Sequence, residues 1–310
     1  MQGYNKISPR SWLAFDLNVL RRIEFDSIAI PFSGSGEVGG YLKRTGVRVA
    51  ANDPLFSAWA DSYVHIANSR EELSAEDIET ILEDAYVPGY ELKNPTLANW
   101  FSETDSWWLD NVRRNIDRLA TTGLKAIASR IAIAAGDYVF AFSGENRRLR
   151  QPLSNTYRRL CSLQPRPFDN RQNNTCSTKI PDDFIAETHT DLMFLRLPAA
   201  HAQPLRNHLG RAAWREEWIR GSAGFWDKLE NAAAHRLGAP TETKSQYIQL
   251  LEETLQRASH IPKWAIAHVE DGFLQTQDIV DAVARIRKVD AIYSKDFTEL
   301  TGTKAAIITA

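Results

Sequence analysis

The sequence predicts an α/β protein whose parallel sheet is assembled from both ends of the chain. Three observations indicate this class: a strand-helix-strand pattern over residues 27–51, a helical pattern over 56–142, and strands alternating with helices from 192 onward. Two strands joined by a helix are the unit from which parallel sheets are built. We therefore expect one sheet and a helical middle that covers it.

The first half of the chain supplies the clearest elements. Apolar runs predict strands at 27–31 and 47–51, separated by a glycine-rich turn at 32–40 and a short helix. In the middle, Leu109, Val112 and Ile116 follow one another at three- and four-residue spacing, as on the buried side of a helix. This half should therefore provide the start of the sheet and most of the helices.

The second half completes the sheet after an interruption. Residues 143–185 are rich in Gly, Pro, Asn, Gln and Arg and lack periodicity, which predicts a long irregular insertion. Residues 1–142 and 186–310 then form one core with a helical subdomain. The later elements are expected as strands at 192–195, 264–267, 289–293 and 305–308 and as helices at 205–220, 247–258 and 276–286.

Composition excludes several classes of protein. Across 310 residues, 37 Lys and Arg stand against 39 Asp and Glu, so a uniformly basic nucleic-acid coat is excluded. No apolar run approaches the roughly 20 residues that span a bilayer, and the first residues lack a signal-peptide pattern, so we expect a cytoplasmic protein without membrane contact. Cys161 and Cys176 have no zinc-site spacing, and we expect no metal.

A glycine-rich turn is the strongest local motif. Residues 34–39 fit the pattern Gly-x-Gly-x-x-Gly, and Asp53 lies at the end of the next predicted strand. In a dinucleotide site the glycines admit a pyrophosphate and the acid binds the ribose hydroxyls. In an S-adenosylmethionine site the same bare backbone admits the methionine part. The motif by itself is compatible with both ligands.

Phe32-Ser33-Gly34-Ser35-Gly36, followed by Asn52-Asp53, resembles the cofactor-binding part of the Dam-like class of adenine-specific DNA methyltransferases. Weaker similarities lie at 100–113, 125–142, 264–273 and 305–309. The resemblance implies a Rossmann-like methyltransferase fold with S-adenosylmethionine as cofactor. It assigns cofactor binding to Phe32, Gly34, Gly36 and Asp53.

The resemblance also locates the family's catalytic turn, Asp-Pro-Pro-Tyr, whose acid and carbonyl accept the hydrogens of the adenine amine. Here that position reads Arg196, Leu197, Pro198 and Ala199. Arginine has five donors and no acceptor, and its charge would repel the sulfonium of the cofactor. The turn is therefore degenerate. Ile30 also replaces an acid before the glycine turn, so both a retained and a vestigial cofactor pocket are compatible with the sequence.

Residues 147–179 carry eight basic side chains and the single acid Asp169. Such a local excess of positive charge in a near-neutral protein predicts a DNA-binding surface. The expected phosphate contacts are Arg147, Arg148, Arg158 and Arg159, and the expected base readers are Gln151, Asn155 and Tyr157. The alternative is a solvated segment whose arginines pair with acids elsewhere.

Together these features lead to a hypothesis: a DNA-binding, catalytically degenerate methyltransferase homologue. It would act as a binding or scaffolding subunit, beside an active methyltransferase subunit or in a homo-oligomer. Two alternatives stay open. One is an active adenine-specific enzyme that uses a displaced acid, Asp191 or Asp53; the other is a nucleotide-dependent oxidoreductase built on the glycine turn.

Overall fold

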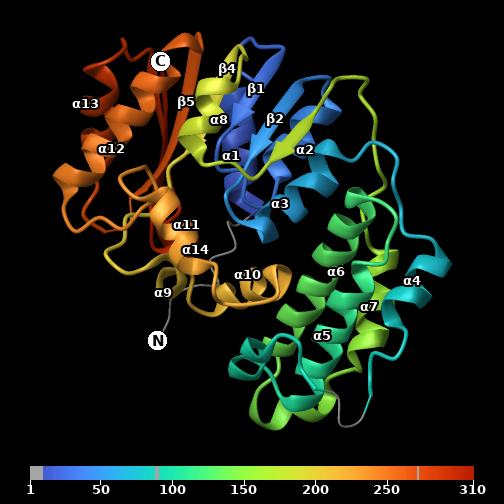
Figure 1. Ribbon diagram of the computed structural model, residues 1–310. Helices are drawn as coiled ribbons and strands as arrows, with labels where there is room; N and C mark the ends of the chain where they lie inside the picture. Colours follow the sequence, from blue (N-terminus) through green and yellow to red (C-terminus); the bar gives the residue numbers. More distant parts are fainter. Residues whose placement is uncertain (1–9, 88–90, 271) are drawn as a thin grey trace.

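The computed structural model describes residues 10–87, 91–270 and 272–310; Asp271, inside the predicted similarity at 264–273, lies outside them. The chain forms a seven-stranded mixed sheet in the order β3-β2-β1-β4-β5-β7-β6, with a group of helices beside it (Figure 1). The strands are β1 (Ser27–Ile30), β2 (Arg48–Asn52), β3 (Thr175–Ser177), β4 (Leu192–Arg196), β5 (Lys263–Glu270), β6 (Ala291–Asp296) and β7 (Lys304–Thr309). The strands β3, β2, β1, β4 and β5 are parallel to one another, and β7 is antiparallel to both of its neighbours, β5 and β6. The predicted α/β class is confirmed.

Helices cover both faces of the sheet (Figure 1). One face packs against α1 (Arg10–Leu20) and α2 (Glu37–Arg44), and the other against α8 (Pro181–Glu187), α12 (Lys244–Arg257) and α13 (Thr276–Ala284). Strand β4 shows why both are needed: Leu192 and Phe194 enter the first core, and Met193 and Leu195 enter the second. Successive side chains of a strand point to opposite faces, so an uninterrupted apolar strand requires a cover on each side.

The helical middle forms its own apolar core beside the sheet. Its members are α3 (Phe56–Ser62), the π-helix η1 (Tyr63–Ala67), α4 (Ala75–Leu82), η2 (Pro95–Asn99), α5 (Glu103–Ile116), α6 (Thr122–Phe140), α7 (Leu153–Ser162) and α10 (Ala213–Arg220). Trp108, Trp214 and Trp218 are completely buried at its centre. Helix α10 arrives from the far half of the chain, and the indole of Trp218 donates to the carbonyl of Leu109 (2.8 Å). This contact fixes α10 to α5.

The prediction of an irregular segment at 143–185 is wrong in three places, at α7, at β3 and at the start of α8. Helix α7 packs against α6 through Leu153 and Tyr157, and β3 pairs with β2 as the edge of the sheet. Tyr157 is fully buried and donates to the carbonyl of Ala128 (3.3 Å), so it cannot read a DNA base. The segment therefore contributes to the core of the helical group and to the cores on both faces of the sheet. A 3₁₀ turn, η3 (Gly144–Leu149), precedes α7.

The remaining short elements connect these layers. They are α9 (Leu205–Leu209), η4 (Gly210–Ala212), α11 (Trp226–Ala233), η5 (Ala258–His260) and α14 (Thr298–Thr301). Across the described residues, every helix is too short or too polar to cross a membrane. Within the same ranges, His, Cys, Asp and Glu side chains form no group of three placed to hold a metal ion.

Candidate functional site

The predicted site residues lie at the carboxyl ends of the parallel strands. We call this end of the sheet, with the glycine turn, Asp53 and Arg196, the edge site. The glycine turn follows β1, Asp53 follows β2, and Arg196 is the last residue of β4. Ligands of open α/β sheets bind at this edge, where the loops leave the strands. Asp191 precedes β4 and thus lies at the opposite edge.

Asp53 is hydrogen-bonded to the glycine turn. Its carboxylate accepts from the backbone N–H of Gly34 (3.0 Å) and from that of Leu55 (3.0 Å). Gly36 is required for close packing, because a Cβ atom there would lie 2.6 Å from the Cα of Ser62 in α3. The predicted proximity of the glycine turn and Asp53 is thus present in the structure. This arrangement is compatible with a ribose ligand of either predicted class.

The pKa of Asp53 is raised from 3.8 to about 7, mainly by burial and to a smaller extent by the carboxylates of Glu216 and Asp61, although the two backbone N–H donors lower it. The Asp53 side chain therefore changes its charge near neutral pH. The side chain is a carboxylate, which only accepts hydrogen bonds, above this pH and a carboxylic acid, which can also donate one, below it.

We expect the free energy of unfolding to fall by about 2 kcal/mol between pH 5 and pH 7 because of Asp53 alone. Its folded pKa is raised, so the folded state holds more protons than the unfolded state in this window, and stability decreases as pH rises. Urea denaturation of the wild type and of Asp53→Asn across this range measures the effect. The variant should show the flatter dependence; parallel curves would contradict the assignment.

Asn52 has a structural role instead of a ligand-binding one. Its side-chain amide donates to the carbonyls of Pro31 (3.2 Å) and Lys179 (2.9 Å) and accepts from the hydroxyl of Ser177 (2.8 Å). These contacts link the ends of β1, β2 and β3. Asn52 therefore holds the strand ends in position beside Asp53.

Arg196 occupies the position of the missing catalytic acid and forms an ion pair with Asp16 of α1. The Asp16 side chain is 3% exposed. Burial raises its pKa to about 6, although Arg196 opposes this shift. The guanidinium also lies 5.7 Å from the ring centre of Phe194. The predicted repulsion of a bound sulfonium is thus reduced, because Asp16 neutralises the guanidinium; Arg196 still supplies no acceptor.

The rest of the degenerate turn lies beside the glycine turn. Leu197 continues the pairing with β5 by donating to the carbonyl of Ala267 (2.9 Å), and Tyr247 donates to the carbonyl of Pro198 (2.7 Å). A Cβ atom at Gly238 would lie 3.6 Å from both Phe32 and Pro198, so the segment around Gly238 joins the two turns. Ala199 is exposed.

Asp191 links the amino-terminal ends of β4 and β1. Its carboxylate accepts from the backbone N–H groups of Asp26 (3.0 Å) and Ser27 (2.8 Å) and from the Ser27 hydroxyl (2.8 Å). These donors lower its pKa. The structure therefore does not bring Asp191 to Arg196 or to the glycine turn.

Helix α10 contributes an acid that no sequence motif indicated. Glu216 is buried and accepts from the backbone N–H groups of Phe56 (3.1 Å) and Ser57 (2.6 Å) at the start of α3. Arg220 pairs with Glu216 (2.9 Å) and donates to the carbonyl of Pro54 (3.3 Å). The chain directly after Asp53 is therefore fixed by α10.

The four predicted phosphate-binding arginines form two pairs at opposite ends of α7. Arg147 and Arg148 are exposed on η3 and line a hollow of about 560 Å³. Arg159 is exposed, whereas Arg158 binds Glu79 through two hydrogen bonds (2.6 and 3.0 Å). The predicted alternative, pairing with acids elsewhere, thus applies to Arg158, and within the same segment also to Arg150, which pairs with Asp105, and to Lys179, which pairs with Glu187. Gln151 and Asn155 are exposed, unlike Tyr157.

Comparison with protein-family models and with curated proteins identifies no relative of this chain. No protein-family model matches the chain, and no curated protein is significantly similar to it. The chemistry of the edge site therefore depends on its own residues: the glycine turn, the Gly34–Asp53 hydrogen bond and the Arg196–Asp16 pair.

Proposed function

We propose that this protein is a DNA-binding homologue of the Dam-like adenine-specific DNA methyltransferases that does not transfer methyl groups itself. The observation that carries the proposal is the Arg196–Asp16 ion pair at the end of β4. A permanent donor stands where the reaction needs an acceptor, and Asp16 is itself engaged with that donor. We therefore expect no methyl transfer at this turn.

The strand order supports the methyltransferase-like fold. An antiparallel last strand between the fifth and sixth strands, as β7 lies between β5 and β6, is typical of S-adenosylmethionine-dependent methyltransferases. A fold alone does not establish an activity. It does favour this family over dinucleotide-dependent oxidoreductases, whose sheets end without such a strand.

S-adenosylmethionine is the proposed ligand of the edge site, with Gly34, Gly36 and Phe32 around its methionine part and Asp53 at its ribose. The fit rests on the Gly34–Asp53 hydrogen bond and on the close packing that Gly36 permits. A thermal-shift comparison tests it: S-adenosylmethionine should raise the melting temperature of the wild type and not of Asp53→Ala. Stabilisation by nicotinamide dinucleotides instead would favour the oxidoreductase.

Exposed arginines support DNA as the partner. Arg147, Arg148 and Arg159 are exposed at the surface of the helical group, and no ion pair neutralises them among the described residues. Guanidinium groups of this kind bind phosphate oxygens and release counterions. An active methyltransferase subunit or a second copy of this chain would supply catalysis in the assembly.

DNA binding should depend on the unpaired arginines and not on Arg158. For Arg147→Gln/Arg148→Gln, the slope of log affinity against log salt should decrease by about 2, because two phosphate contacts are lost. Arg158→Gln is the matched control: Glu79 already neutralises Arg158, so its slope should stay near the wild-type value. Fluorescence anisotropy with a labelled duplex measures both. Equal slopes for wild type and double variant would contradict the assignment.

The absence of methyl transfer is tested with labelled S-adenosylmethionine and adenine-containing DNA. The purified chain should incorporate no methyl group above a protein-free background, while binding the same DNA by anisotropy. Any incorporation by the purified chain would overturn the proposal, and its loss in Asp53→Asn would favour the displaced-acid enzyme.

A further inference from the structure

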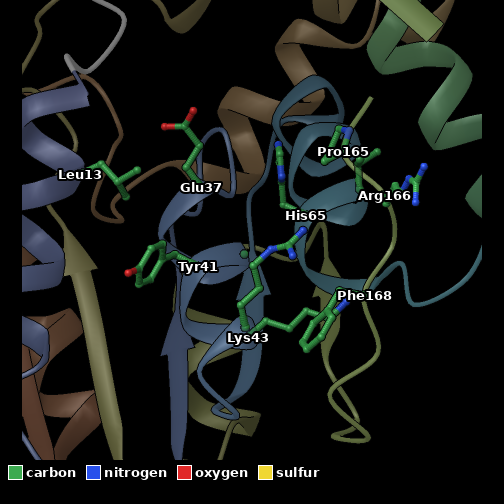
Figure 2. A pocket seen from close by; sticks show the side chains of 11 residues that line it. Leu13, Glu37, Tyr41, Lys43, His65, Pro165, Arg166 and Phe168 are labelled. Atoms are coloured by element: carbon green, nitrogen blue, oxygen red, sulfur yellow. The ribbon is translucent and has the colours of Figure 1, made fainter. Parts of the chain in front are cut away.

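A second cavity lies away from the edge site, between α1, α2, η1 and the chain after α7. Its volume is about 240 Å³. Figure 2 shows Leu13 on one side, Pro165 and Phe168 on the other, and Tyr41 and Lys43 of α2 between them. None of the residues assigned to the edge site lines it. The cavity is therefore a separate feature of the molecule.

Its lining carries an excess of positive charge. Lys43, Arg44 and Arg166 face a single lining carboxylate, that of Glu37. Lys43 is 1% exposed, and its ammonium group donates to the carbonyl of Asn68 (2.6 Å). An ammonium group has three donors, and the carbonyl takes one among the described residues. Burial lowers the pKa of Lys43, and the carboxylate of Asp169 opposes this shift. Because the ammonium group is closed off from solvent, it attracts an anion in the cavity through its charge and not through a direct hydrogen bond.

Positive charges in and near the cavity also act on His65. Burial and the nearby cations Arg130 and Arg44 lower the pKa of this imidazole to about 4. His65 is therefore neutral at physiological pH, with its Nε2 atom 3.4 Å from the guanidinium of Arg130. At this wall the carboxylate of Asp61 pairs with Arg130 (2.9 Å). The positive charge in the cavity therefore comes mainly from Lys43, Arg44 and Arg166.

The walls hold their shape because α2 and η1 are in close contact. A Cβ atom at Gly40 would lie 2.9 Å from the Cβ atom of His65, so only glycine permits this approach. Helix η1 is a π-helix, a form that is rare and concentrated at functional sites. The cavity is therefore built by specific backbone geometry.

An aromatic ring at the mouth adds a second kind of recognition. Phe168 is 38% exposed, and the guanidinium of Arg44 lies 5.4 Å from its ring centre. Arginine binds phosphate through its planar fork, and an exposed ring stacks with a planar base. The lining thus combines an anion-binding group and a stacking group within one small space.

We propose that this cavity binds a nucleoside monophosphate, with the phosphate at Arg44, near the buried charge of Lys43, and the base at Phe168. The site is independent of the edge site and of the proposed DNA surface. Salt should weaken this binding, because both cations contribute through their charge.

Isothermal titration of the full chain with AMP, adenosine and inorganic phosphate tests the site. AMP should bind at least tenfold more tightly than adenosine, and Arg44→Gln should weaken AMP about tenfold by removing a charged hydrogen bond. Arg285→Gln, an exposed arginine across the sheet, is the matched control and should bind AMP as the wild type does. Phe168→Ala should weaken AMP and leave phosphate unchanged.

Asp53→Asn separates this cavity from the edge site. AMP binding should persist in this variant, whereas a nucleoside held at the glycine turn would be lost. The proposal is overturned if AMP releases no heat, if Arg44→Gln binds it as well as the wild type, or if Asp53→Asn alone abolishes binding. Because Arg44 and Phe168 are exposed, both variants should fold, which circular dichroism verifies.

Discussion

Glu217→Ala should lower the free energy of unfolding by about 2 to 4 kcal/mol, because it removes one buried acceptor that serves several donors. The Glu217 side chain in α10 is completely buried. It accepts from the indoles of Trp100 (2.7 Å) and Trp226 (3.0 Å) and from the guanidinium of Arg206 (2.6 Å). Alanine would leave the buried indole of Trp226 and the partly buried indole of Trp100 without their acceptor, whereas Arg206 is 39% exposed and can turn to water. Urea denaturation at pH 7 measures the loss.

Two further variants locate the cause. Glu217→Gln keeps an acceptor but loses the charge, so its cost should be intermediate. Glu72→Ala changes an exposed glutamate and should stay within about 0.5 kcal/mol of the wild type. A cost below about 1 kcal/mol for Glu217→Ala would show that this carboxylate does not hold α10 in place.

Arg196→Leu should cost about 3 to 5 kcal/mol at pH 8, because it leaves the buried Asp16 carboxylate without its counter-charge. The pKa of Asp16 is already raised to about 6, and loss of Arg196 would raise it further. The folded state then binds a proton that the unfolded state releases, so stability falls as pH rises through this range. The cost should therefore shrink toward pH 5. Denaturation at both pH values measures the difference.

The double variant Asp16→Leu/Arg196→Leu separates the ion pair from the space that it fills. With both charges removed, most of the stability should return, because apolar pairs often replace buried ion pairs without loss. A double variant as unstable as Arg196→Leu would mean that packing, and not the unpaired carboxylate, determines the cost. A pH-independent cost for the single variant would exclude the role of Asp16.

The strands of the sheet could be predicted because each carries its own signal. Uninterrupted apolar runs marked β1, β4 and β5, and both faces of these strands are indeed buried. The turn between β1 and α2 was marked by its glycines, and spacing alone paired it with Asp53. Such features are local in sequence, so a pattern can specify them.

Strand β3 had no comparable signal. It consists of Thr175, Cys176 and Ser177, which are exposed or half-buried. Its conformation depends on the ladder with β2 and on the Asn52 side chain, which come from a distant part of the chain. Helix α7 was missed because its many polar residues obscured a buried stripe that includes Leu153 and Tyr157. Tertiary contacts, and not local preference, decide both elements.

The partner of Arg196 could not be predicted for the same reason. Asp16 lies in α1, far away along the chain, and no motif joins the two residues. The composition of the basic segment indicated charge but not its neutralisation, so Arg158 was grouped with arginines that are free of ion pairs. Ion pairs between distant elements follow from the fold, and the fold is what a single sequence specifies least directly.

The placement of β7 constrains how the molecule is made. This strand comes last of the seven along the chain, yet it lies inside the sheet, with β5 on one side and β6 on the other. Until β7 has been synthesised, β5 therefore has one unpaired hydrogen-bonding edge and β6 has no neighbouring strand. Open edges attract other chains, and pairings between distant segments form slowly. The ribosome-bound intermediate should thus be the species most vulnerable to aggregation.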